Sequence, residues 1–99
     1  MAGREDLVLT DSSRVAEIVL SPGEESPWHI HSDVVEHVFC LSGKIEVHCL
    51  DPDDAVELCP GEKVEVQPLR QHRITNYTGS DSKYLLVQRG TYDFIHRDS

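Results

Sequence analysis

Three histidines and one glutamate combine the side-chain types and the spacing of a metal site. His29 and His31 are two residues apart, so in a β-strand both imidazoles project from the same face. Glu36 follows after a Ser-Asp turn signal, and His72 lies in a later stretch, HRITN, that also reads as a strand. Three imidazoles and a carboxylate that converge inside a β-barrel would hold one divalent transition metal, namely Fe, Mn, Ni, Zn or Cu. Four protein ligands would leave open positions for water or a substrate.

The segments that must position these ligands read as short β-strands. No window carries apolar residues at the helical period, whereas apolar and polar residues alternate in stretches such as KIEVHCL and KVEVQ. Gly, Pro, Asp and Ser separate these stretches, and many short strands with frequent turns predict a sandwich or barrel. The expected strands are 6–10, 14–20, 27–31, 35–41, 44–50, 55–59, 62–67, 71–77, 83–89 and 91–96.

Two further residues are candidates for contact with a substrate. If the Ser-Gly pair at 42–43 forms a two-residue hairpin turn, Cys49 lies opposite Glu36. Cys49 is then either a reactive thiol beside the metal or a small buried apolar residue. Arg70 precedes the last histidine by two residues, so its guanidinium either holds a substrate carboxylate or phosphate or stays solvated in a loop. The catalytic residues are not evident, because Glu36 is committed to the metal.

The overall charge excludes several classes of partner. The chain of 99 residues carries 18 Asp and Glu against 9 Lys and Arg, a net charge of −9. Proteins that bind nucleic acid normally carry a basic stripe, and anionic membranes repel an acidic chain, so we expect neither partner. No apolar stretch approaches the ~20 residues of a membrane span, and the N-terminus lacks the pattern of a secretory signal. With only three cysteines, the sequence predicts one cytoplasmic domain over 1–99.

The spacing of the ligands resembles that of the cupin superfamily. The first cupin motif, G-x5-H-x-H-x4-E-x6-G, is met over 23–43 at every specified position, by Gly23, His29, His31, Glu36 and Gly43. The second motif, G-x5-P-x-G-x2-H-x3-N, keeps its spacing over 60–76 in Gly61, His72 and Asn76. It departs from the family at Gln67, where the motif has proline, and at Leu69, where it has glycine.

This resemblance implies an all-β fold, a double-stranded β-helix or jelly-roll barrel of the RmlC-like kind. It further implies a metal near the middle of the barrel, a pocket for a small-molecule ligand or substrate, and a homodimer. A fainter similarity, in EHVFCLSG, HRITN and LVQRGTYDF, links the chain to the cupin domain of type II mannose-6-phosphate isomerases. The acidic signature that should follow the last of these segments is missing. The final stretch, with Tyr92 and Phe94, either caps the barrel or crosses to a partner subunit.

The resemblance does not select a reaction, because cupins include dioxygenases, isomerases, lyases and non-enzymatic binders. The leading hypothesis is a metal-dependent enzyme of isomerase, lyase or dioxygenase type that acts on a small oxygenated metabolite. The alternative is a non-catalytic cupin that binds or senses a metal or small ligand. A third hypothesis is a dimer in which the metal only stabilises the barrel. Whether the chain is an enzyme stays open from the sequence.

Overall fold

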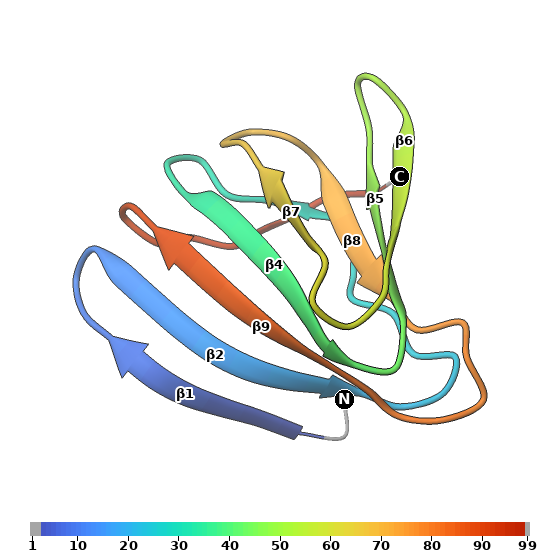
Figure 1. Cartoon of the computed structure of the whole chain (residues 1–99). Coiled ribbons are helices and arrows are strands. Elements are labelled where there is room, and N and C mark those ends of the chain that lie inside the picture. The colour runs from blue at the N-terminus through green and yellow to red at the C-terminus, as the bar shows by residue number, and fades with distance from the viewer. Residues whose placement is uncertain (1–2, 99) are drawn as a thin grey trace.

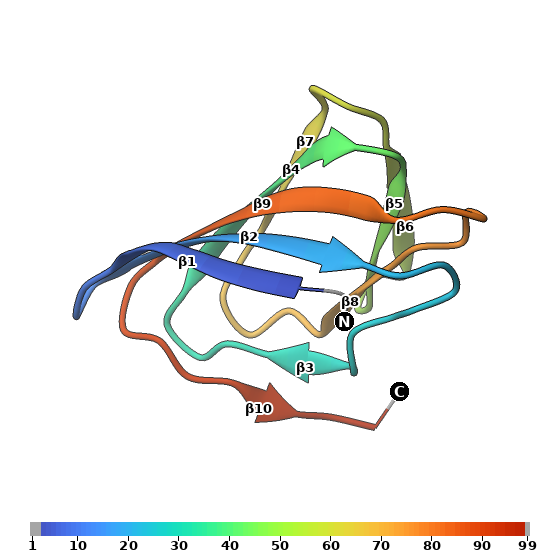
Figure 2. The ribbon, with the colours of Figure 1, turned by 90° about the horizontal axis from the view of Figure 1, so that it is seen from below.

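Ten antiparallel strands form two facing sheets in the computed structural model, which describes residues 3–98. The first sheet has the strand order β1-β2-β9-β4-β7, and the second has the order β10-β3-β8-β5-β6. Figures 1 and 2 show the two sheets facing each other and diverging from one end. The strands are β1 (Gly3–Leu9), β2 (Ser13–Leu20), β3 (His29–Ile30), β4 (Val35–Ser42), β5 (Ile45–Cys49), β6 (Asp54–Leu58), β7 (Lys63–Val66), β8 (His72–Thr75), β9 (Ser82–Arg89) and β10 (Ile95–His96).

The expected all-β architecture is confirmed, and every predicted strand has a counterpart. β3 and β10 are much shorter than predicted, with two residues each. The described part of the chain contains no helix long and apolar enough to cross a membrane.

The core follows from the alternation of side chains along the strands. In β4 and β5 every second residue is buried, and these inward residues include Val38, Cys40, Ile45 and Val47. Their apolar side chains pack with those of β2, β8 and β9 in one cluster between the sheets. β9 lies between β2 and β4, as its apolar sequence on both faces requires, and it presents Tyr84 and further inward side chains to the barrel interior.

The predicted hairpin between β4 and β5 is wrong. β4 pairs with β9 and β7, whereas β5 pairs with β6 and β8 in the other sheet. Gly43, with a φ of 74°, turns the chain from one sheet to the other, and a side chain there would collide with Ser82. Cys49 therefore lies opposite His72 and not opposite Glu36.

Asn76 ties together two loops at one end of the barrel. Its side chain is fully buried, and its Nδ2 donates to the carbonyls of Leu20 (3.0 Å), Ser21 (3.2 Å) and Ser80 (2.8 Å). Its Oδ1 accepts hydrogen bonds from the backbone N–H and the hydroxyl of Thr78. These contacts give Asn76 a structural role, because they satisfy polar groups of both loops away from water.

Gly90 directs the C-terminal segment back toward the site. Its φ is 126°, and a Cβ at this position would collide with the carbonyl of Asp33. After this turn the chain passes under the first sheet, and β10 pairs with β3 (Figure 2). Tyr92 and Phe94 therefore cap the barrel of their own chain.

Candidate metal centre

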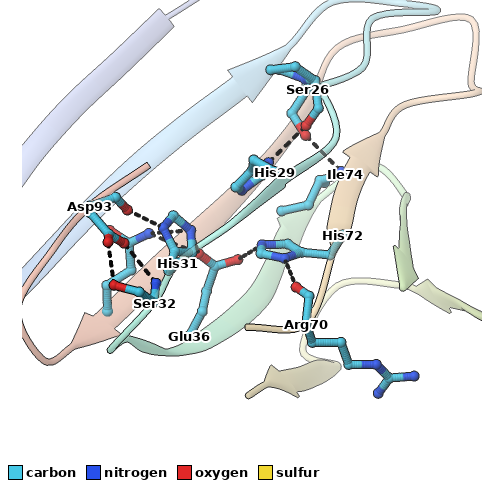
Figure 3. Close-up of polar contacts among 11 residues, drawn as sticks. Ser26, His29, His31, Ser32, Glu36, Arg70, His72, Ile74 and Asp93 are labelled. Atoms are coloured by element: carbon cyan, nitrogen blue, oxygen red, sulfur yellow. Dashed lines mark hydrogen bonds and ion pairs between the residues drawn. The ribbon is translucent and has the colours of Figure 1, made fainter. Parts of the chain in front are cut away.

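The four predicted ligands meet between the two sheets. His29 lies in β3, His31 just after it, Glu36 in β4 and His72 in β8. All four are buried, and one ligand atom from each lies within 4.8 Å of the others. Figure 3 shows the imidazoles of His31 and His72 on either side of the Glu36 carboxylate.

Strand pairing explains this convergence. His29 and His72 are direct cross-strand partners in the second sheet, which brings their rings to a centroid distance of 4.2 Å. Glu36 reaches the same point from the first sheet, where it faces inward between Val66 and Gln88. The turn between β3 and β4 resets the alternation, so Glu36 points to the interior although it lies an odd number of residues after His31.

The backbone sets the tautomer of all three histidines. The Nδ1 atoms of His29, His31 and His72 lie 2.8, 2.5 and 2.9 Å from the carbonyl oxygens of residues 27, 93 and 70 (Figure 3). A carbonyl oxygen only accepts, so each Nδ1 carries the proton and donates it. The Nε2 lone pairs are thereby left for a ligand role, as in known metal-binding histidines.

The Glu36 contacts are those of a site that needs a cation. Its Oε1 lies 3.1 Å from Nε2 of His31, and its Oε2 lies 3.1 Å from Nε2 of His72. With the proton on Nδ1, each contact brings two lone pairs together, so either a further proton or a metal ion must stand between them. Atoms that share one ion at 2.0–2.2 Å are at most about 4.4 Å apart. The observed spread exceeds this by only a few tenths of an ångström, so the donor set fits a divalent transition metal.

The electrostatics of the cluster are strongly coupled. Burial alone raises the pKa of Glu36, but hydrogen bonds with His31 and His72 outweigh it and hold this pKa well below its usual range. At His31 burial lowers the pKa, yet the hydrogen bonds with Glu36 and with the Asp93 carbonyl outweigh it and raise the pKa. Burial and the neighbouring His72 lower the pKa of His29 to about 4. Protons and a metal ion therefore compete for the same Nε2 atoms.

Two contacts around the cluster were not predicted from the sequence, namely the hydrogen bond of Gln88 and the stacking of Phe94 on His29. Gln88 on β9 donates from Nε2 to Oε1 of Glu36 at 2.8 Å and so fixes the carboxylate. Phe94 stacks on His29 with ring centroids 4.3 Å apart and an interplanar angle of 14°. The sequence does contain an indication of Gln88, because this polar residue continues the inward alternation of β9 two residues after the apolar Leu86. The pairing of Phe94 depends on a long-range return of the chain that no local pattern encodes.

A cavity of about 280 Å³ opens beside the cluster. His29, His31 and Glu36 form one part of its wall, so bound ligands reach the donor atoms. Most of the remaining wall is aliphatic or aromatic, contributed by Ile18, Leu20, Ile74, Leu86, Tyr92 and Phe94. This arrangement, a concave apolar space with a few convergent polar groups, is typical of small-molecule sites.

The structure places Arg70 and Cys49 outside this cavity wall. The Arg70 guanidinium donates to the carbonyls of Leu50 (3.4 Å) and Pro52 (2.9 Å), and only its backbone carbonyl contacts the cluster, at His72. Cys49 is buried beside His72, and burial raises the pKa of its thiol, which disfavours the nucleophilic thiolate.

The family of the chain is decided by a comparison of sequences. The family model described as a cupin domain matches residues 16–88, most of the chain. This chain is a cupin. No curated protein matches the sequence of this cupin.

Solved structures share the fold of this cupin at low sequence identity. An uncharacterised conserved protein with a double-stranded β-helix domain from Klebsiella pneumoniae superposes with a TM-score of 0.85 at 22% identity, over 97% of this chain and 84% of that one. The cupin domain of an XRE family transcriptional regulator from Enterobacter cloacae gives 0.78 at 22%, over 88% and 94%. A sugar phosphate isomerase of the cupin superfamily from Silicibacter pomeroyi gives 0.78 at 24%, over 100% and 68%. These likenesses establish the double-stranded β-helix fold and no activity.

Proposed function

We propose that this cupin is a metal-dependent enzyme of isomerase, lyase or dioxygenase type that acts on a small oxygenated metabolite. One divalent transition ion, of Fe, Mn, Ni, Zn or Cu, would be held by His29, His31, Glu36 and His72. The observation that carries the proposal is that three of these ligands line a cavity of about 280 Å³. A purely structural metal site would be closed off by its ligands and the core.

The residues around that ion either orient its ligands or line the cavity. When bound, the ion supplies a Lewis acid that stabilises negative charge developing on a substrate oxygen. The hydrogen bond from Gln88 holds the Glu36 carboxylate in place, and the carbonyl of Asp93 holds the His31 ring. Phe94, stacked on His29, and Tyr92 narrow the cavity and reduce the access of water.

A non-catalytic sensing role is the second candidate. This role is favoured because the cluster lacks a group that could take a proton from a substrate. Glu36 is the only fully buried carboxylate within residues 3–98. Its oxygens are engaged by His31, His72 and Gln88, so it is not available as a general base. The metal cluster itself therefore offers no free base, and a cluster of this kind can bind a ligand without converting it.

Metal analysis tests the shared premise of both candidates. We expect protein purified without chelator to hold about one transition metal ion per chain by mass spectrometry, and His72→Ala to lose it. His37→Ala is the matched control, because His37 lies on β4 next to Glu36 but faces the other side of the sheet. A metal-free wild type that cannot be loaded, or a His72→Ala variant that keeps the ion, contradicts the proposal.

Two activity measurements separate the reaction classes. Oxygen uptake by the iron-loaded protein with a panel of small carbonyl and hydroxy compounds indicates a dioxygenase. Incorporation of solvent deuterium into such compounds, followed by NMR, indicates isomerase or lyase chemistry. Compounds that bind but show neither change favour the sensing role.

We further propose a cytoplasmic homodimer that uses the outer face of the first sheet. On that face Val15 and Val87, and Leu85 and Phe39, are cross-strand neighbours and only half-buried. Such an apolar surface favours association with a second copy. Light scattering coupled to size-exclusion chromatography tests it, with Leu85→Lys expected to give the monomer and a monomeric wild type contradicting the proposal.

A further inference from the structure

The cavity contains a polar group that the metal cluster does not use. Tyr84 on β9 is only 3% exposed and lines the cavity wall. Within residues 3–98 no hydrogen-bond partner contacts its hydroxyl. The hydroxyl is not one of the enclosed polar atoms that lack a partner in the described residues, so it borders the cavity, where a ligand or water can accept its hydrogen bond. The Tyr84 hydroxyl therefore indicates where an acceptor atom of a ligand belongs.

Arg4 reaches the same part of the cavity from the edge strand. Strand pairing places Arg4, Ile18 and Tyr84 in one row across β1, β2 and β9, and all three line the cavity. Arg4 uses Nε for Asp6, at 3.2 Å, and in the described part of the chain its terminal nitrogens have no partner. An unshared pair of guanidinium nitrogens is the usual receiver of a carboxylate.

The electrostatics agree that the Tyr84 hydroxyl lies between these two charged regions. Burial raises the pKa of Tyr84 most, the Glu36 carboxylate raises it further, and the Arg4 guanidinium lowers it. The net effect is a raised pKa, so the hydroxyl keeps its proton at neutral pH and donates a hydrogen bond.

The charges and walls of the cavity restrict what binds between the two polar ends. Arg4 is the only arginine or lysine in the described wall, which also contains the carboxylates of Glu24, Glu25 and Glu36. A single guanidinium can pair with one negative charge, whereas the carboxylates of the wall repel a phosphate dianion, which needs several donors and cations. The wall between the ends is apolar, with Ile18, Leu86 and Phe94 facing the space. An apolar ligand body is stabilised there by removal from water.

We infer that the cavity binds a small monocarboxylate with an apolar body, its carboxylate on Arg4 and the Tyr84 hydroxyl and its other end facing the histidine–glutamate cluster. This inference deepens the proposed function, because it names the class of substrate or sensed ligand. It assigns Tyr84 and Arg4 as binding residues that select for a single negative charge.

The test compares two probes of the same shape in metal-free protein. 3-Phenylpropanoate carries the carboxylate, and 3-phenylpropanamide is its neutral analogue. Titration calorimetry on the wild type in the presence of chelator should give an affinity for the acid about tenfold or more above that for the amide, as expected for charge-assisted hydrogen bonds. Equal affinities, or no binding of the acid, overturn the inference.

Matched variants assign the effect to the two residues. We expect Arg4→Gln to weaken binding of the acid about tenfold and Tyr84→Phe about three- to tenfold, with little effect on the amide. Arg97→Gln and Tyr77→Phe, which change residues outside the cavity wall, should leave both affinities within about twofold. Variants that bind the acid as tightly as the wild type overturn the assignment. If Tyr84→Phe does not fold, the comparison of acid and amide binding in the wild type and in Arg4→Gln still tests the inference.

Because chelator is present, this readout does not depend on the metal. Selective binding of the acid by metal-free protein supports the inference even if the metal analysis fails. A loaded metal site in a protein that does not distinguish acid from amide refutes the inference and leaves the proposed function standing.

Discussion

Replacement of His29 by glutamine should flatten the acid dependence of stability in the metal-free protein. The pKa of His29 is lowered from 6.5 in the unfolded chain to about 4 in the fold, mainly by burial. The unfolded chain therefore binds more protons between these values, and folding stability falls as the pH falls from about 6.5 to 4. At 1.36 kcal/mol per pKa unit, this group removes up to about 3 kcal/mol, of which about 2.5 kcal/mol is lost by pH 4.5.

Urea unfolding at pH 7 and pH 4.5, with chelator, measures this difference. Wild type should lose about 2.5 kcal/mol more than His29→Gln between the two pH values. Glu36 and His31 titrate in both proteins, so their contributions to the pH dependence of the free energy of unfolding cancel in the comparison. His96→Gln is the control, because His96 is exposed and its variant should follow the wild type. Equal pH dependence in His29→Gln and wild type would refute the burial of a neutral imidazole at this position.

Three further predictions concern the loops, the carboxylate and the ion. Asn76→Ala should lower the free energy of unfolding by about 3–5 kcal/mol, since it leaves buried carbonyls without a donor; a loss below about 1 kcal/mol in urea unfolding would contradict its role. Gln88→Leu should weaken metal binding about 10- to 100-fold in competition with a chromophoric chelator, and unchanged affinity would show that Glu36 needs no such support. Metal at a hundred times its Kd should stabilise the fold by about 2.7 kcal/mol, or about 10–20 °C in Tm; calorimetry with and without chelator would disprove this if the transitions coincide.

Local patterns in the sequence were sufficient to predict the strands, and the spacing shared with the cupin superfamily added Glu36 and His72 to the ligand cluster. The alternation in β4, β5 and β7 places their inward residues correctly, because strand geometry has a period of two. The two-residue spacing of His29 and His31 places both on one face for the same reason. These predictions need no knowledge of which strands pair.

Predictions that required a pairing partner failed or stayed open. The hairpin over 42–43 is wrong because both edges of β4 are already occupied by β7 and β9, which come much later in the chain. The orientation of Arg70 could not be predicted, because it depends on carbonyls of the β5–β6 loop. Tyr84 and Gln88 lie in a largely apolar stretch, and only the register of β9 against β4 places Gln88 beside the cluster and Tyr84 further along the cavity wall.

The orientation of the three imidazoles by peptide carbonyls affects how such a protein can diverge. Any residue supplies a carbonyl, so the side chains of Pro27 and Arg70 can change while their carbonyls still accept the Nδ1 protons of His29 and His72. The surrounding loops and pocket walls can therefore change during evolution while the orientation of the metal-ligand side chains is kept. This separation accounts for how one small barrel can serve unrelated reactions.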